Sequence, residues 1–228
     1  MMNQTISPPT SRKAAVRSKL KSKAAGIGLV VATLALTSCG GDEAKGEVSN
    51  VMEQGASESI LAVDGAELVR NADGIRLSET VPTPPPGSYE YPVADMVPPW
   101  GIPQPEVSPG SEDEPEVFTL WVAVFNNPDL CTDSACDADD LTPDAPAQGG
   151  VYQADGLVAD ESEIEFVGAV RLGQDPSTGA ALENPFGAEI HTFIAPHGKA
   201  LTGPDLWSQL NGPVGTPALW WDAVFSAD

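Results

Sequence analysis

The segment VFTLWVAVFN, residues 117–126, is almost continuously apolar and is rich in β-branched and aromatic residues. These side chains are the ones that are enriched in β-strands. A run that stays apolar, instead of alternating with polar residues, indicates a strand whose two faces are both covered. We therefore expect this segment to be a central strand of a β-rich domain.

Shorter segments with strand character lie on both sides of it and are separated by Gly, Pro, Asp and Asn. They are 66–81, with two strands about an Asn-Ala-Asp-Gly turn, and 150–158, 162–172, 188–195 and 218–225. In one of them the apolar residues alternate with polar ones and share a face, namely Ile164, Phe166, Val170 and Leu172. Only residues 203–211 look helical. This pattern favours a single antiparallel β-sandwich of the immunoglobulin-like kind with one short helix.

The segment 82–116 interrupts the strand pattern. It holds eleven of the 22 prolines of the chain, and proline cannot donate a hydrogen bond to a strand ladder. We expect an extended surface insertion, in which Tyr89, Tyr91 and Trp100 either pack against the domain or form a binding surface.

The N-terminal region has the pattern of an export signal. Residues 12–23 are basic, and the apolar run AAGIGLVVATLAL (24–36) is too short to span a membrane. The sequence LTSC, which ends at Cys39 and precedes two glycines, resembles the bacterial lipobox. That resemblance implies a signal peptide over residues 1–38 and acylation of Cys39 by fatty acids such as palmitate. The alternative is an ordinary signal peptide with a cysteine there by chance.

Residues 39–65 are small, polar and acidic without periodicity, and we expect them to form a flexible tether. The domain would then occupy residues 66–228, held at a membrane of the bacterial cell envelope, on the periplasmic or the cell-surface side. From Cys39 onward the chain has five basic and 33 acidic residues, a net charge of −28. This charge argues against nucleic acid as a partner. An envelope protein or a surface ligand is the expected partner besides the membrane.

Two cysteines remain, Cys131 and Cys136, directly after the expected central strand. In an exported chain such a pair predicts a small disulfide-closed loop. A redox pair or half of a metal site is the alternative, but the spacing is not C-x-x-C and no second cysteine pair is present.

The stretch GAEIHTFIAPHG, residues 187–198, contains both histidines of the chain. In a strand, Glu189 and His191 would share one face, and His197 would lie on the turn beyond. One carboxylate and two imidazoles are a ligand set for zinc or copper. We favour a structural interpretation, in which His191 hydrogen-bonds a neighbouring strand and His197 completes a tight turn.

The acidic loop around the cysteine pair is a second candidate site. Its aspartates are Asp133, Asp137, Asp139, Asp140 and Asp144. Clustered carboxylates could bind calcium. The loop lacks the glycine and the closing glutamate of an EF-hand, so we favour a solvated acidic loop over a calcium site.

Several motifs occur in a fixed order along the chain: FTLWVAVFNNPDLC with the second cysteine, GGVYQADGLVAD, GAEIHTFIAPHG and QLNGPVG. This series resembles a family of exported bacterial lipoproteins without an assigned function. The stretch AEIHTFIAPHG is also similar to a strand of chordin-type (CHRD) domains, which are β-rich extracellular modules. Neither resemblance implies a catalytic residue or a cofactor.

No G-x-S-x-G motif or other nucleophile motif is present. We therefore expect a lipid-anchored binding or structural module without enzymatic activity. The alternative is a metal-binding protein or a metal-dependent enzyme that uses His191, His197 and Glu189.

Overall fold

The computed structural model describes residues 44–53, 59–86, 108, 110–111, 113–133, 135–142, 144–159, 161–212 and 221–227, and every structural statement below concerns these residues. The predicted signal peptide, Cys39 and most of the proline-rich insertion, including Tyr89, Tyr91 and Trp100, lie outside them. What the sequence indicates for those segments therefore stays a prediction.

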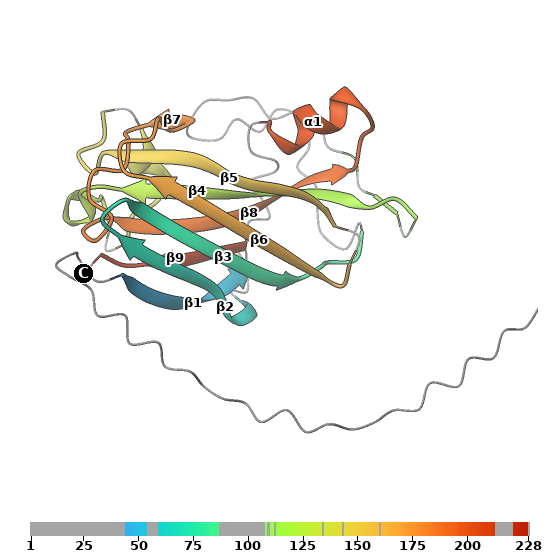
Figure 1. The fold of residues 1–228 in the computed structure, drawn as a ribbon, viewed down its shortest axis with the longest axis horizontal. Helices are drawn as coiled ribbons and strands as arrows, with labels where there is room; N and C mark the ends of the chain where they lie inside the picture. Colours follow the sequence, from blue (N-terminus) through green and yellow to red (C-terminus); the bar gives the residue numbers. More distant parts are fainter. Residues whose placement is uncertain are drawn as a thin grey trace, which may run out of the picture. The chain divides into compact units, whose positions relative to one another are not determined.

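Nine strands and one α-helix form the described part of the chain (Figure 1). The strands are β1 (Lys45–Glu53), β2 (Ser59–Asn71), β3 (Gly74–Pro82), β4 (Glu116–Phe125), β5 (Gly149–Ala159), β6 (Glu163–Arg171), β7 (Thr178–Gly179), β8 (Glu189–Lys199) and β9 (Trp221–Phe225). The helix α1 spans Pro204–Leu210, and two 3-10 helices, η1 (Pro128–Leu130) and η2 (Ala138–Leu141), follow β4. The prediction of an all-β fold with one short helix is confirmed.

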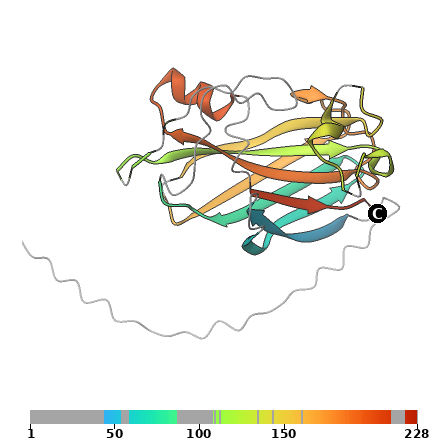
Figure 2. The same ribbon diagram turned by 180° about the vertical axis from the view of Figure 1, so that it is seen from behind.

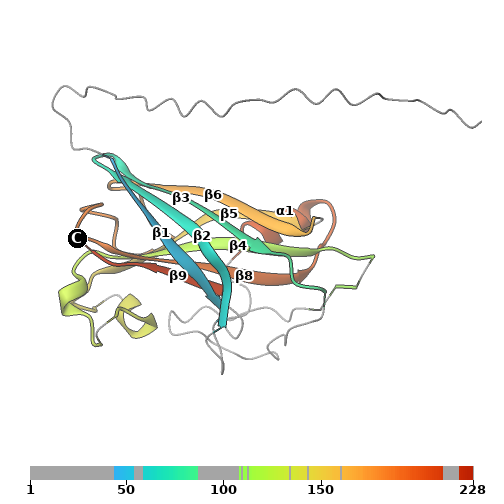
Figure 3. The same cartoon turned by 90° about the horizontal axis from the view of Figure 1, so that it is seen from below.

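The strands form one antiparallel sheet in the order β6-β3-β2-β1-β9-β8-β4-β5-β7. The sheet curls over, so that β1, β2 and β3 cross β4 and β8 at an angle (Figure 3). Between the two layers lies one apolar core with contributions from both, including Leu68, Leu77, Phe166, Phe118, Val122 and Ile190. Where β5 and β6 approach each other, the backbone N–H of Val167 donates to Asp155 Oδ2 at 3.1 Å.

The expected central strand is confirmed as β4. All ten of its residues are buried, and it pairs with β5 on one side and β8 on the other. β6 shows the predicted alternation, with Ile164, Phe166 and Val170 buried. Leu172 does not join them, because it lies one residue beyond the strand and is exposed.

The prediction of a flexible tether over residues 39–65 is wrong at Lys45–Glu53 and again from Ser59 onward. β1 and the first part of β2 lie in that interval. Only Val51 of β1 is fully buried, so the strand has no apolar periodicity to recognise in the sequence. Its backbone instead pairs with β2 from Lys45 to Glu53, and at two positions with β9. The folded domain therefore starts well before residue 66.

β8 is longer than predicted and runs through the Pro-His-Gly sequence to Lys199. His197 is consequently a strand residue and not a turn residue. The pairing with β4 continues to the Glu116–Lys199 pair, with a register shift before Phe118, which is opposite Pro196. A proline is tolerated in an inner strand at such an irregularity.

Candidate functional site at the disulfide loop

The chain after β4 folds into a compact loop, here called the disulfide loop, whose described residues lie in 127–142. Cys131 and Cys136 are joined by a disulfide, as predicted. The loop and α1 lie at opposite ends of the sheet (Figure 2). Its entry is fixed by the Asn127 side chain, which donates to the carbonyl of Pro146 at 3.2 Å.

The buried carboxylate of Asp140 organises the interior of the disulfide loop. Its Oδ1 accepts hydrogen bonds from the backbone N–H and the hydroxyl of Thr132, at 3.0 and 3.1 Å. Its Oδ2 accepts from the backbone N–H of Asp137 at 3.1 Å, and Asp137 in turn accepts from the backbone N–H of Asp139. Asp137 and Asp140 form a capping box that starts η2.

The structure does not bring the aspartates of the alternative calcium site together. Asp140 points into the loop, whereas Asp133, Asp137 and Asp139 are exposed. In the described residues, one group of three possible metal ligands has its ligand atoms within 4.8 Å of one another: Cys131, Cys136 and Asp140. Both of its sulfur atoms belong to the disulfide and are not thiolates. The described aspartates of the disulfide loop therefore do not come together as a group of calcium ligands.

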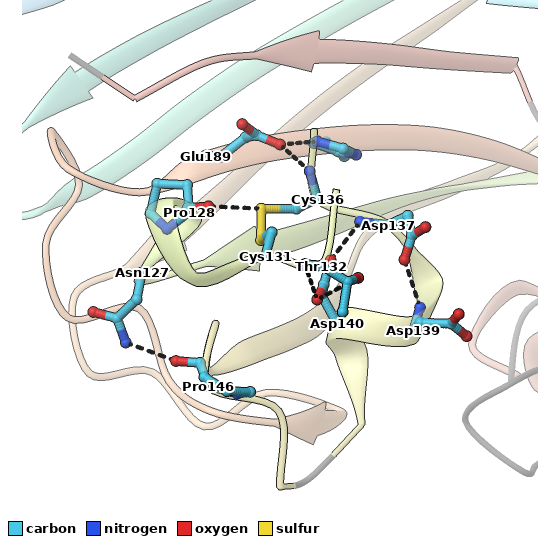
Figure 4. Close-up of a disulfide and its surroundings, with 11 residues drawn as sticks. Asn127, Pro128, Cys131, Thr132, Cys136, Asp137, Asp139, Asp140, Pro146 and Glu189 are labelled. Atoms are coloured by element: carbon cyan, nitrogen blue, oxygen red, sulfur yellow. Dashed lines mark hydrogen bonds and ion pairs between the residues drawn. A yellow bond between two sulfur atoms is a disulfide. The ribbon is translucent and has the colours of Figure 1, made fainter. Parts of the chain in front are cut away.

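Glu189 ties the disulfide loop to β8 (Figure 4). Its Oε1 accepts from the backbone N–H of Cys136 at 2.9 Å and lies 2.7 Å from Nε2 of His191. The hydrogen bond with His191 lowers the pKa of Glu189, the burial of the carboxyl opposes this, and the bond from Cys136 again lowers the pKa. The edge-to-face contact of the His191 ring with Phe125, at 5.1 Å between ring centroids, fixes the imidazole from the other side.

A pocket of about 460 Å³, here called the loop pocket, lies between the disulfide loop and the strands β4, β8 and β9. Its apolar lining residues are Ala123, Phe125, Ala135, Ala138, Leu141, Phe193 and Val224. Its polar lining residues include His191, Asp137, Asp139 and Asp222, and no lysine or arginine is among the described residues that line it. The loop pocket thus combines apolar surface with negative charge and one imidazole.

His197 lies far from the loop pocket. It is six residues beyond His191 in the same strand, which corresponds to roughly 20 Å. Its Nε2 is 2.8 Å from the hydroxyl of Thr119, which also accepts the indole N–H of Trp121. Burial lowers the pKa of His197 to about 4. The structure therefore brings Glu189 and His191 together but separates His197 from them, so these three residues do not form the zinc or copper site of the alternative interpretation.

Two buried charged residues were not predicted from the sequence. Arg70 is completely buried in β2, and the sequence gives no signal for this. Glu79 is completely buried in β3, where it follows Ile75 and Leu77 on the inner face. That period-two pattern was a usable signal for a carboxyl group in the core.

Comparison with known proteins finds no match to a family model, to a curated protein or to a solved structure. Within the described residues, no helix has the length and apolar character that crossing a membrane requires.

Proposed function

We propose that this chain is a binding module, held at a membrane of the bacterial cell envelope by acyl groups on Cys39, and that its ligand binds in the loop pocket. The main support for binding is the double contact of Glu189, which holds His191 and the disulfide loop as one wall of the pocket. A wall that is already in place loses little conformational entropy when a ligand binds. The disulfide leaves no cysteine thiolate there to act as a nucleophile.

The lining of the loop pocket suits a ligand that has a positive charge and an apolar body. Asp137, Asp139 and Asp222 would attract an ammonium or guanidinium group. The side chains of Phe125 and Phe193 would cover the apolar part of such a ligand. The same carboxylates would repel an anion.

Benzylamine is a suitable probe, because it joins an ammonium group to an aromatic ring. We expect saturable binding by calorimetry, together with a shift of the His191 imidazole resonances in the NMR spectrum. Benzyl alcohol and benzoate have the same ring without the positive charge, so they should bind at least about tenfold more weakly.

Two matched variants test the place of binding. Asp222→Asn removes one carboxylate of the loop pocket and should weaken benzylamine binding, whereas Asp133→Asn changes an exposed residue outside its lining and should not. Equal binding of benzylamine and benzoate, or binding without any response of His191, would contradict the proposed site.

The acyl anchor is tested separately. Cells grown with radiolabelled palmitate should label the parent chain and not the Cys39→Ser variant. Equal labelling of the two chains would show that Cys39 is not the acylated residue.

A further inference from the structure

A second hollow, of about 600 Å³, lies at the end of the sheet where β1 begins, between the β2–β3 turn and the end of β6. Arg76 and Arg171 both line it. Arg76 pairs with Ala169, and Arg171 pairs with Gly74, so the two arginines are diagonal neighbours on one face of the sheet. Glycine is required at position 74 for this close pairing, because a Cβ there would overlap the carbonyl oxygen of Val170 and lie 2.8 Å from Cα of Arg171.

Neither arginine of this hollow forms an ion pair with a residue in the described ranges. Two carboxylates are close in the fold. Glu67 of β2 is a diagonal neighbour of Arg76 of β3, and Asp73 lies in the β2–β3 turn. Two guanidinium groups without a carboxylate partner are unusual in a chain with 33 acidic residues. Their forked N–H groups match the oxygen atoms of a phosphate group.

We propose that Arg76 and Arg171 bind the phosphate of an anionic phospholipid headgroup in the membrane that holds the acyl anchor. This inference rests on the acylation of Cys39 in the proposed function. Its ligand is the lipid of the membrane surface and is independent of the ligand of the loop pocket.

The short chain between Cys39 and the sheet keeps this end near the membrane. Six residue steps separate Cys39 from Lys45, the first residue of β1, and they can span at most roughly 20 Å. β1 and β6 are three strand positions apart, about 14 Å. Figures 1 and 3 show the start of β1, the β2–β3 turn and the end of β6 together at one end of the sheet.

The charge distribution also favours an orientation in which the end of the sheet with this hollow faces the membrane. The chain from Cys39 onward carries a net charge of −28, so an anionic lipid surface repels most of the domain. Of its five basic residues, Arg70 is buried, Lys199 is bonded to Glu114, and Lys45 forms an ion pair with Glu47. The hollow with Arg76 and Arg171 is therefore the part of the described surface best suited to face anionic headgroups.

The test uses the full acylated chain reconstituted in vesicles of phosphatidylglycerol or of phosphatidylcholine. Phenylglyoxal modifies accessible arginines, and peptide mass spectrometry gives the rate for each one. We expect Arg76 and Arg171 to react about fivefold more slowly in phosphatidylglycerol. This is the factor by which an anionic lipid surface favours the bound state of one basic residue over its free state. Arg70 should stay unreactive in both vesicles, because it is buried.

Inorganic phosphate added to the phosphatidylcholine vesicles separates a lipid headgroup from a free anion. Protection by phosphate without protection by phosphatidylglycerol would overturn the lipid assignment. A chain that floats with both vesicle types but shows equal arginine rates would contradict this inference alone. A chain that floats with neither would contradict the acyl anchor and, with it, this inference.

Variants give a readout that does not depend on arginine chemistry. In phosphatidylglycerol vesicles, the amides of residues 71–74 should exchange with deuterium more slowly than in phosphatidylcholine. We expect Arg76→Gln combined with Arg171→Gln to abolish this difference, and Lys199→Gln, at the far end of β8, to preserve it. A double variant that keeps the difference would contradict the role of the two arginines.

Discussion

Nε of the buried Arg70 donates to Oε1 of Glu47 at 2.6 Å. The two terminal nitrogens of the guanidinium donate to four backbone carbonyls, those of Pro185, Ala188, Phe225 and Ser226. All five N–H groups of the side chain are thus used. Arg70 therefore connects β2 to β1, to the segment before β8 and to the end of β9.

Replacing Arg70 should be among the most damaging single changes in this chain. Arg70→Met would leave the Glu47 carboxylate without its closest partner and four carbonyls without this donor. We expect a loss of about 3–5 kcal/mol in the free energy of unfolding, measured by urea denaturation. Arg76→Met, an exposed change on the neighbouring strand, should stay within about 0.5 kcal/mol of the parent. Similar losses for both variants would show that the Arg70 network is not what stabilises the domain.

Glu79 should make the stability of the domain depend on pH. Burial raises its pKa to about 8; the nearby Thr192 opposes this rise and the charge of Asp222 reinforces it. Neither carboxyl oxygen has a hydrogen bond of normal geometry among the described residues. An unfolded chain loses the Glu79 proton near pH 4.5, whereas the folded chain keeps it until about pH 8. Its contribution to stability is therefore greatest below pH 4.5 and falls as the pH rises to about 8.

Glu79→Gln should remove this dependence, because glutamine does not titrate. The variant should gain stability relative to the parent between pH 4.5 and 8, and the difference should be constant above pH 8. Glu165→Gln, at an exposed position of β6, is the control. Urea denaturation at several pH values measures the effect, and a pH-independent difference between Glu79→Gln and the parent would contradict a neutral Glu79.

His197 should also make the stability of the domain depend on pH, but with the opposite sign to Glu79 and at lower pH. Burial lowers its pKa to about 4, whereas an unfolded histidine binds a proton near pH 6.5. The stability that it contributes is present above pH 6.5 and is lost as the pH falls toward 4. The His197 imidazole resonances should accordingly stay those of the neutral ring down to about pH 5 in an NMR titration. A midpoint near pH 6.5 in the folded protein would contradict the buried position.

The disulfide should contribute modestly to stability because the loop that it closes is short. Replacing Cys131 and Cys136 by serine should cost about 2 kcal/mol in the free energy of unfolding. Ser162→Ala, at an exposed position, is a control for surface changes. Mass spectrometry after alkylation without reductant should find no free thiol at the two cysteines in the exported parent. Two alkylated cysteines would show that the bond does not form.

The parts of the fold that the sequence predicts are those with a strong local signal. The unbroken apolar run predicts β4, and the alternation around Ile164 and Phe166 predicts β6. β1 has no such signal, because its place is set by hydrogen bonds to β2 and not by apolar side chains of its own. A flexible tether and an exposed strand have similar compositions, so the boundary at residue 66 was wrong.

The candidate site is predicted in part for the same reason. Period two places Glu189 beside His191, and the scarcity of cysteine predicts the bond between Cys131 and Cys136. The contact from Glu189 to the backbone N–H of Cys136 joins residues that are 53 positions apart, which no local pattern reports. His197 was misplaced because Pro-His-Gly is a common turn sequence, while here the pairing with β4 continues through it.

The place of β9 in the sheet has a consequence for how the domain assembles. β9 is the last of the nine described strands along the chain, yet it lies between β1 and β8 and joins the two halves of the sheet. Until its five residues have left the ribosome, β1, β2 and β3 can pair among themselves but cannot be joined to β8 through the ladder. Strand pairs so distant in sequence form slowly, since a long loop must close first. The chain can therefore complete its sheet only after this late strand has been synthesised.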